Sequence, residues 1–187
     1  MEFNFPQNIS ISENLRLCSF TPKDYISLWI LIEKNRSYLE KWLPWVDTTT
    51  QPEHSLHFIM GTILCARKGK EVHWGIYEDD LLIGLIGAHH LDWENSHGMI
   101  GYWLDEEEQG KGIITSVVQA LLPIFHQELG LKTVEIRAST LNKPSNQVAI
   151  RAGFSYIETL PKSDKVQDIW HDLNVYQHTA ELKEESQ

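Results

Sequence analysis

Hydrophobic positions recur along this chain with two different periods, and the change falls near residue 70. In the first part they recur every three or four residues, which is typical of helices that bury one face. The spacing predicts a helix that Thr21 caps and Pro22 begins, a short helix over Asn35–Leu43 and a longer helix over Pro52–Lys68. The first part of the chain is therefore expected to be mainly helical.

From residue 72 onward, apolar and polar positions mostly alternate, which is typical of strands. With one strand before the first helix, the predicted strands are Leu15–Cys18, Val72–Tyr77, Leu81–Leu91, Ile100–Leu104, Thr133–Ala138, Phe154–Leu160 and Asp172–Ala180. Helices are predicted at Ile113–Leu129, which Pro123 should kink, and at Pro144–Ala152. This order predicts one α/β (α+β) domain over residues 1–187. Its mixed, mostly antiparallel sheet has six or seven strands, one parallel crossover and flanking helices.

Composition and charge narrow the range of functions. The 187 residues carry a net charge of −10, so the chain lacks the basic face that general nucleic-acid binding requires. Apolar runs are far shorter than the roughly 20 residues that cross a bilayer, and the first residues do not resemble a secretory signal. Cys18 and Cys65 are interpreted as buried, reduced thiols. We therefore expect a cytoplasmic protein that binds neither membranes nor nucleic acid.

The strongest chemical signal is a pair of glycines between a predicted strand and a predicted helix. Gly110 and Gly112 follow the strand that ends at Leu104, and the helix begins directly afterwards at Ile113. Glycines let the main chain approach a ligand closely, and the unpaired N–H groups at a helix start bind anions. An ordinary glycine turn is the alternative. The segment fits neither GxxxxGK[ST] nor GxGxxG, because Ile113 and Thr115 stand where those phosphate loops need other residues.

The segment Gln109–Thr115 resembles the Q/R-x-x-G-x-G/A loop with which GNAT acetyltransferases bind acyl-CoA, except that Ile114 occupies the last position. The subgroup that resembles ribosomal-protein N-terminal acetyltransferases (RimJ/RimL type) tolerates a larger apolar residue there. Further segments similar to this subgroup occur in order, and the resemblance extends from about Leu15 to Ala180. They are Asn35–Leu39, Trp42–Trp45, Ile100–Leu104, Asn142–Ala149 and Arg151–Phe154.

The resemblance implies a GNAT fold, acetyl-CoA as cosubstrate without a metal, and roles for the matching residues. Main-chain N–H groups of the loop would hold the pyrophosphate. The loop comprises Gln109, Gly110, Lys111, Gly112, Ile113, Ile114 and Thr115. Tyr102, Trp103 and Leu104 would pair with the pantetheine arm and offer one N–H group to the oxyanion.

Near the sulfur of the cofactor, the resemblance places Asn142, Ser145 and Asn146. Ser145 would protonate the leaving thiolate, since its hydroxyl can donate a hydrogen bond. The alternative is that Ser145 only caps the start of its helix.

The residue that accepts the proton of the amine is harder to identify. Many GNAT relatives carry an acid on the strand before the loop, whereas His97–Ile100 contains no carboxylate. The subgroup places acids near the acceptor in the segment between the last two strands, where Asp164 and Asp168 lie. We expect Asp164 to act as general base, directly or through one water. A water relay, with both carboxylates solvated in a loop, is the alternative.

Several other acidic, histidine and tryptophan residues can be explained without a catalytic role. The acids Asp105–Glu108 are expected to face solvent, because they would repel a pyrophosphate. His89 and His90 are neighbours in a strand, so they are expected on opposite faces, and two histidines alone do not make a metal site. Trp42 and Trp45 either shape an acceptor pocket or pack in the core.

Three functions follow from these observations. The leading hypothesis is acetyl transfer to an amine, namely the N-terminal α-amino group of a protein, and the resemblance implies a ribosomal protein. A small amine such as an amino acid, polyamine or aminoglycoside is the alternative acceptor. A non-catalytic acyl-CoA-binding module is an alternative of another class. The sequence leaves open the identity of the acceptor, a different acyl donor and a homodimer.

Overall fold

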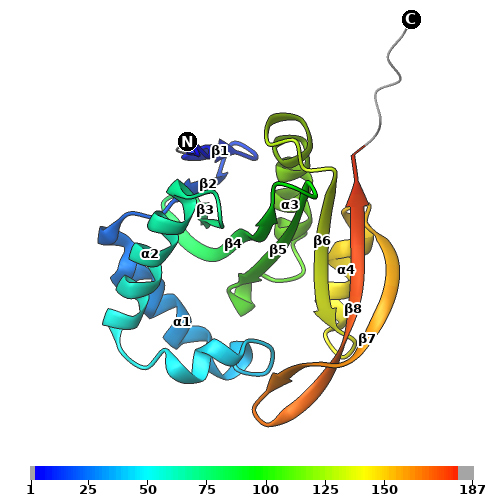
Figure 1. The fold of residues 1–187 in the computed structure, drawn as a ribbon. Coiled ribbons are helices and arrows are strands. Elements are labelled where there is room, and N and C mark those ends of the chain that lie inside the picture. The colour runs from blue at the N-terminus through cyan, green and yellow to red at the C-terminus, as the bar shows by residue number, and fades with distance from the viewer. Residues whose placement is uncertain (1–2, 181–187) are drawn as a thin grey trace, which may run out of the picture.

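In the computed structural model, which describes residues 3–180, the chain folds around one sheet (Figure 1). The strands are β1 (Asn8–Ser10), β2 (Leu15–Ser19), β3 (Val72–Glu78), β4 (Leu81–Asp92), β5 (His97–Leu104), β6 (Thr133–Ser139), β7 (Ser155–Val166) and β8 (Ile169–Thr179). Their order in the sheet is β1-β2-β3-β4-β5-β6-β8-β7. Neighbours are antiparallel except for the parallel pair of β5 and β6. The predicted mixed sheet and its single parallel crossover are confirmed, and the unpredicted β1 raises the number of strands to eight.

Helices cover both faces of this sheet (Figure 1). The helices α1 (Tyr25–Leu39) and α2 (Pro52–Arg67) lie on one face. The other face carries α3 (Ile113–Pro123), which connects β5 to β6, and α4 (Lys143–Arg151). The sheet is therefore the middle layer, and a residue of a central strand belongs to one helical layer or the other.

Two adjacent residues of β5 illustrate this division. Trp103 pairs with Leu85 of β4, and both pack in the cluster of buried side chains beneath α1 and α2. Tyr102 pairs with Ile86, and both pack in the cluster beneath α3. Because successive side chains of a strand alternate between faces, β5 presents different residues to the two sides of the sheet.

Pro123 changes the hydrogen bonding of the helix that follows β5. The α-helical part, α3, ends at Pro123, and residues Ile124–Glu128 continue as a π-helical turn. Proline has no N–H group to donate to the carbonyl four residues earlier, and π-helical turns accommodate such interruptions. The hydrogen bonding of the helix therefore changes at Pro123, the residue at which the sequence predicts a kink.

The predicted separate helix over Asn35–Leu43 is wrong, because α1 continues without a break to Leu39. Asn35 lies inside the helix and is buried. Its Nδ2 donates to the Leu31 carbonyl at 2.9 Å, and its Oδ1 accepts from the Glu106 N–H at 2.9 Å. A buried Asn is tolerated in a helix when its amide is hydrogen-bonded in this way. Residues Pro44–Thr48 then form a short 3-10 helix.

Two expectations from the sequence concern the cysteines, as buried, reduced thiols, and the lack of a membrane span. Cys18 and Cys65 are both free, as expected, but each is partly exposed rather than buried. Within residues 3–180, every helix is too short or too polar to cross a membrane.

Candidate active site

Strands β5 and β6 separate half-way along their length. They are hydrogen-bonded from the pair His97–Thr133 to the pair Ile100–Ile136. Beyond that point, residues 101–104 of β5 pair with β4, and residues 137–139 of β6 pair with β8. The facing edges of β5 and β6 there have no ladder between them in the described sheet. An extended ligand can therefore hydrogen-bond to this opening as an added strand does.

The glycine loop lies at the end of this opening. Gly110 and Gly112 adopt φ angles of +75° and +80°, a conformation that favours glycine, and α3 begins at the next residue. A Cβ added to either glycine would meet nothing within 4 Å. Glycine is therefore required here for its backbone angle, and the space above the loop is open to a ligand. The first N–H groups of α3 point out of the helix without an intrahelical partner, which is the arrangement of an anion site.

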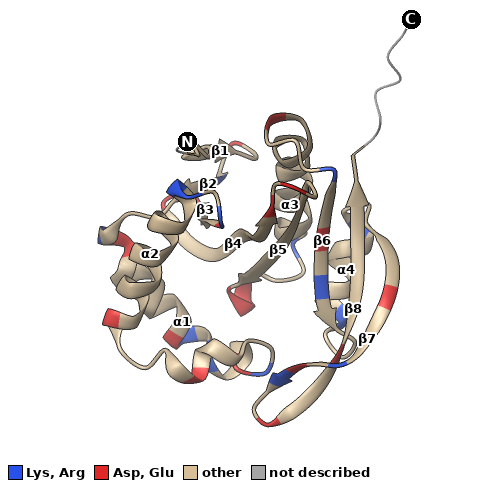
Figure 2. Cartoon of the chain, in the orientation of Figure 1, with Lys and Arg blue, Asp and Glu red and all other residues tan. Residues whose placement is uncertain are grey.

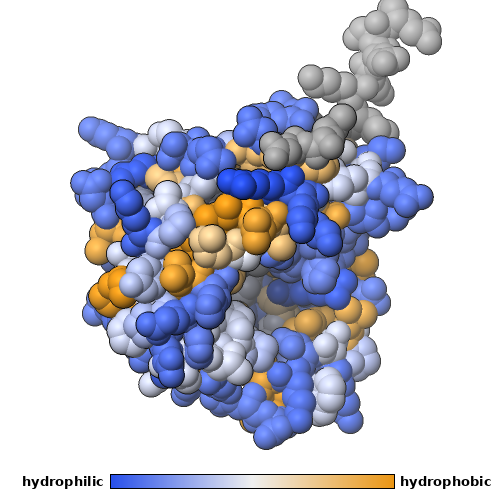
Figure 3. Space-filling view, turned by 60° about the vertical axis from the view of Figure 1, so that its left-hand side comes forward, coloured by the Kyte–Doolittle hydropathy of each residue, from blue (hydrophilic) through white to orange (hydrophobic). Residues whose placement is uncertain are grey.

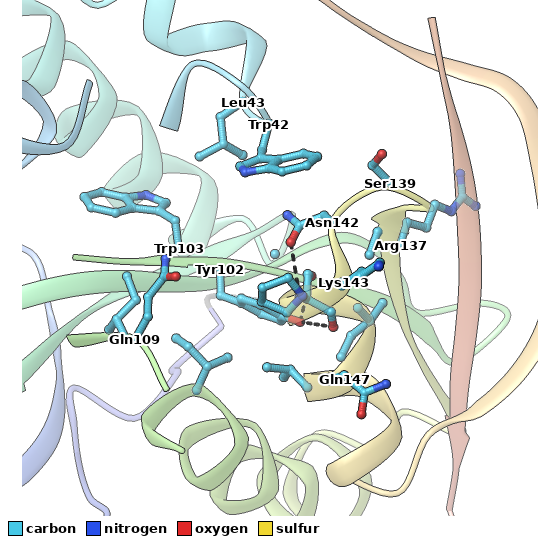
Figure 4. Close-up of a pocket in the computed structure, with 18 of the residues that line it drawn as sticks. Trp42, Leu43, Tyr102, Trp103, Gln109, Arg137, Ser139, Asn142, Lys143 and Gln147 are labelled. Atoms are coloured by element: carbon cyan, nitrogen blue, oxygen red, sulfur yellow. Dashed lines mark hydrogen bonds between the residues drawn. The ribbon is translucent and has the colours of Figure 1, made fainter. Parts of the chain in front are cut away.

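A cavity of about 890 Å³ joins the opening, the loop and the start of α4. Figure 4 shows Trp42 and Leu43, from the turn after α1, reaching into it opposite Tyr102 and Asn142. Twelve of the predicted site residues line it. They are Tyr102, Trp103, Leu104, Gln109, Gly110, Gly112, Ile113, Ile114, Thr115, Asn142, Ser145 and Asp164. Segments far apart in the sequence thus contribute to one cavity.

Lys111 and Asn146 are predicted site residues that do not line this cavity. The Lys111 ammonium pairs with the Glu108 carboxylate. Asn146 is buried, and its Nδ2 donates to the carbonyls of Ser139 and Asn142 at 2.8 and 2.7 Å. Its Oδ1 accepts from Tyr176 at 2.8 Å. The side chain of Asn146 therefore fixes the start of α4 to the sheet. Asn146 can influence a ligand only indirectly, by holding the start of α4 in place.

Two hydroxyl groups meet where β5 faces α4. The Tyr102 hydroxyl lies 3.1 Å from Ser145 Oγ and 3.2 Å from the Ser145 carbonyl. Asn142 is the N-cap of α4, since its Oδ1 accepts from the Ser145 N–H at 3.2 Å. Ser145 is therefore not the cap, and its hydroxyl is available to the cavity. Burial raises the pKa of Tyr102 to about 12, so this hydroxyl stays protonated at neutral pH. The pairing of Ser145 with Tyr102 left no signal in the sequence.

Asp164 and Asp168 lie in a long hairpin rather than in a loop between two strands. Strands β7 and β8 extend to Val166 and Ile169, so the expected loop is reduced to a turn. Asp164 pairs in register with His171 and lines the cavity. Asp168 lies in the turn, 2.7 Å from Lys165 Nζ, with its side chain 94% exposed. The hairpin therefore places Asp164, the carboxylate that the sequence analysis favours, beside the cavity and Asp168 away from it.

The acidic run beside the loop does not face solvent throughout. Asp105 is 4% exposed, and Lys34 Nζ from α1 lies 2.7 Å from its carboxylate. The same ammonium lies 2.6 Å from the Glu107 carboxylate, so Lys34 pairs with both acids. Asp105 also accepts from the Glu107 N–H at 3.2 Å and caps a 3-10 turn. The expected exposure of Asp105 is wrong, because Lys34 compensates the buried charge.

A second cavity, of about 1080 Å³, lies on the α1–α2 side of the sheet. Figure 3 shows hydrophobic side chains gathered beside a hollow when this side of the molecule is turned forward. His89 and His90 both line the cavity, and their ring centroids are 5.0 Å apart. The expectation that they occupy opposite faces is wrong, because β4 bulges after His89 and His90 has a φ of 51°. Trp42 lines the first cavity and Trp45 the second.

The charged residues decide which ions the site could hold. In Figure 2, Lys and Arg positions are spread over several helices and strands. Among residues 3–180, no three His, Cys, Asp or Glu side chains are grouped so that they could hold a metal ion. Three basic residues, Arg137, Lys143 and Arg151, line the first cavity, so an anionic ligand there can pair with them as well as with the main-chain N–H groups of the loop.

Known proteins share this sequence pattern and this fold. Residues 14–155 match the family model described as Acetyltransferase (GNAT) domain. The chain is similar to the ribosomal-protein-serine acetyltransferase of Escherichia coli (strain K12), with 32% identity over 170 residues. That alignment covers 91% of this chain and 95% of the relative.

Two solved structures are similar over nearly the whole chain. The microcin C7 self-immunity acetyltransferase MccE, in complex with acetyl-CoA and AMP, superposes with a TM-score of 0.89 and 26% identity, covering 94% of this chain and 98% of that one. RimL, the ribosomal L7/L12 alpha-N-protein acetyltransferase, in complex with coenzyme A, has a TM-score of 0.89 and 27% identity, covering 92% and 97%.

Proposed function

Because the chain belongs to the GNAT acetyltransferase family, and is thus an acetyl-CoA-dependent N-acetyltransferase, we propose that its acceptor is the N-terminal α-amino group of a ribosomal protein. One observation carries the assignment of the site. The glycine loop, the opening between β5 and β6, and the Tyr102–Ser145 hydroxyl pair all line the same cavity. Two relatives support the acceptor, since both are described as acetylating ribosomal proteins.

The cofactor occupies the first cavity from the loop to the start of α4. Main-chain N–H groups of residues 109–115 hold the pyrophosphate, helped by the positive end of the α3 dipole. The pantetheine arm pairs with residues 102–104 in the opening between β5 and β6. An N–H group of the same strand donates to the thioester carbonyl, and it stabilises the negative charge that develops on that oxygen.

The reaction is a direct attack of the amine on the thioester. The amine nitrogen bonds to the carbonyl carbon, the carbon–sulfur bond breaks, and the sulfur leaves as a thiolate that takes a proton. Ser145 supplies this proton, and the Tyr102 hydroxyl 3.1 Å away orients or replenishes it. The Tyr102 hydroxyl is protonated at neutral pH, so it can donate a hydrogen bond to Ser145 Oγ and orient the Ser145 proton toward the thiolate.

The amine must lose a proton to form the amide. Asp164 takes it, directly or through one water, from the side of the cavity that the β7–β8 hairpin forms. Asp168 does not contribute, since it lies in the exposed turn with Lys165. A water relay without Asp164 is the alternative.

The test is a screen of peptides in which only the first residues vary, incubated with acetyl-CoA and analysed by mass spectrometry. We expect acetylation of the α-amino group of peptides that copy ribosomal-protein N-termini. The same peptides with a blocked N-terminus but free lysines are the control. Transfer confined to lysine side chains or to small amines would reject the proposed acceptor.

A small amine is the second candidate acceptor, and one comparison favours it. The MccE structure, at 26% identity, contains AMP together with acetyl-CoA. Adding amino acids, polyamines, aminoglycosides and aminoacyl nucleotides to the screen separates this candidate from the first. A kcat/KM for one of these compounds that is higher than for every peptide would favour it.

A further inference from the structure

Gly101 and Arg137 lie next to each other at the point where β5 and β6 separate. The last pair of the parallel ladder is Ile100–Ile136, and both of these side chains pack beneath α3. Because side chains alternate along a strand, the next residues, Gly101 and Arg137, belong to the α1–α2 face. Gly101 has no side chain, so the Arg137 side chain can extend over β5 on this face.

A buried carboxylate anchors one end of the Arg137 guanidinium. Its Nε donates to Glu135 Oε1 at 2.6 Å, and the Glu135 side chain is 5% exposed. The other carboxylate oxygen accepts from Gln177 at 3.0 Å and lies 3.6 Å from His97 Nε2. Burial alone would raise the pKa of Glu135, but hydrogen bonds from Gln177 and Arg137 outweigh it and hold the pKa below its usual value. Glu135 therefore stays ionised at neutral pH and fixes the direction of Arg137.

The other end of the guanidinium faces the first cavity. Arg137 lines this cavity, across from Trp103 in Figure 4, and its two terminal nitrogens have no partner among residues 3–180. Burial lowers the pKa of His89 to about 4, with smaller contributions from His90 and from the charge of Arg137. His89 Nε2 lies 3.1 Å from the position that a Cβ would take on Gly101. The charge of Arg137 therefore acts across the space over Gly101.

This space is the side from which an amine can reach the acetyl group. In the proposed function, the pantetheine arm runs from the loop along residues 104 to 102, so its acetyl end comes to Gly101. The Tyr102–Ser145 hydroxyl pair protonates the thiolate from the α3–α4 face. The amine then attacks from the opposite, α1–α2 face, where Arg137 lies.

A guanidinium in this position suits an oxygen atom close to the reacting amine. In a peptide, the carbonyl oxygen of the first residue is separated from the α-amino nitrogen by only two carbon atoms. A lysine side chain or an alkyl amine has no hydrogen-bond acceptor so near to its nitrogen. The planar guanidinium offers several N–H donors to such an oxygen. Because Glu135 already offsets the charge of Arg137, a neutral carbonyl is sufficient and a carboxylate is not required.

We propose that Arg137 binds the carbonyl oxygen of the acceptor's first residue, and that it thereby selects an α-amine over a side-chain or alkyl amine. The inference rests on the proposed function, because it requires the acetyl end of the cofactor at Gly101. Arg137 orients the acceptor and takes no proton during the reaction. Glu135 acts only through Arg137, by holding its guanidinium in place.

The experiment measures by calorimetry the affinity of two conjugates in which an acetyl linker joins the sulfur of CoA to an amine. One amine is alaninamide, and the other is isopropylamine, in which a methyl group replaces the carboxamide. The parent is expected to bind the alaninamide conjugate about ten-fold more tightly than the isopropylamine conjugate. Arg137→Met should remove this difference and leave the affinity for CoA unchanged. The same variant should lower kcat/KM for a peptide acceptor by about ten-fold.

Two further variants separate binding from folding. Arg137→Met leaves the buried charge of Glu135 without its main partner, which destabilises a protein. The double variant Glu135→Gln/Arg137→Met removes that charge and should show the same loss of the difference. Arg16→Met is the matched control, because the Arg16 side chain is also 39% exposed and pairs with one carboxylate, of Asp80, but lines neither cavity. It should leave the difference unchanged.

The possible outcomes distinguish the inference from the proposed function. A difference between the conjugates that persists in Arg137→Met and in the double variant would reject the inference, and so would an equal loss of affinity for CoA itself. Acetylation of peptides in the acceptor screen would then leave the proposed function standing. A screen in which no peptide is acetylated would reject the proposed function and the inference with it.

Discussion

The two cavities beside β5 are similar in size but differ in how they are built. The first, of about 890 Å³, contains a main-chain anion site, which the glycine loop and the start of α3 form, in addition to side chains such as Trp42 and Tyr102. The second, of about 1080 Å³, is formed by side chains, among them Ser55, His73 and His89. A main-chain site recognises what all acyl-CoA cofactors share, because every residue supplies the same N–H group. A side-chain site can differ from one enzyme to the next.

The largest effect is expected at the phosphate loop. Gly112→Glu should abolish the rise in melting temperature that acetyl-CoA produces, because a ligand of the native state stabilises by mass action. The variant places a carboxylate where the pyrophosphate binds and strains a backbone φ of +80°. Gly130→Glu is the control, since Gly130 also has a positive φ, of +71°, and open space around it, but does not line the first cavity. A cofactor shift that survives in Gly112→Glu would show that the loop is misassigned.

The general base is expected to give the next largest effect. Asp164→Asn keeps the size of the side chain and removes its basicity, so kcat/KM should fall by roughly ten-fold to a thousand-fold. The loss should shrink at high pH, where more of the acceptor amine is already neutral. Asp168→Asn should change kcat/KM little, since Asp168 is exposed in the turn. A pH–rate profile of Asp164→Asn that overlays the parent would leave a water relay as the better account.

Removing a hydroxyl of the Ser145–Tyr102 pair should lower the rate less than removing the general base does. Ser145→Ala should lower kcat by about ten-fold and leave the affinity for CoA nearly unchanged, because the proton is needed in the transition state. Tyr102→Phe should lower kcat less, since the Tyr102 hydroxyl acts through Ser145. Single-turnover measurements separate the chemical step from product release. Equal single-turnover rates for the parent and Ser145→Ala would remove Ser145 from the mechanism.

The histidines of the second cavity should make stability depend on pH. The folded protein holds His73 with a pKa of about 4, below the usual value of 6.5, so the unfolded chain binds more protons between these two values. The contribution of His73 is thus fully present above about pH 6.5, and it is lost as the pH falls toward 4. The loss is on the order of 3 kcal/mol. Urea unfolding at pH 7 and pH 5 should show a smaller difference for His73→Phe than for the parent. The same difference in both would contradict a neutral, buried His73.

Much of the fold and of the first cavity could be predicted because both depend on local signals. The alternation of β5, Gly110 and Gly112, and the start of α3 are adjacent in sequence, so a phosphate site could be located without knowing the tertiary contacts. The buried state of Asp105 could not, since it depends on Lys34, which lies 71 residues earlier. The pairing of Tyr102 with Ser145 is likewise a contact between a strand and a distant helix.

The second cavity was not predictable for a related reason. A bulge after His89 places His90 on the same side as His89. The sequence of the strand contains no residue that predicts this bulge. In the sequence, Ser55 is an ordinary helical residue. Only the structure shows that its hydroxyl is buried and unpaired. The glycines of β4 and β5 were visible in the sequence. Their cross-strand alignment with His73 depends on the register of three strands, which is a tertiary property.

The central claim is that acetyl-CoA binds at the glycine loop of the first cavity and gives its acetyl group to the α-amino group of a peptide. The most direct measurement is the affinity, by calorimetry, of a conjugate that joins CoA to the α-amino group of a peptide. The account predicts that the conjugate binds the parent at least about ten-fold more tightly than CoA does, and that Gly112→Glu abolishes the binding of both. A conjugate that binds no more tightly than CoA would contradict the account.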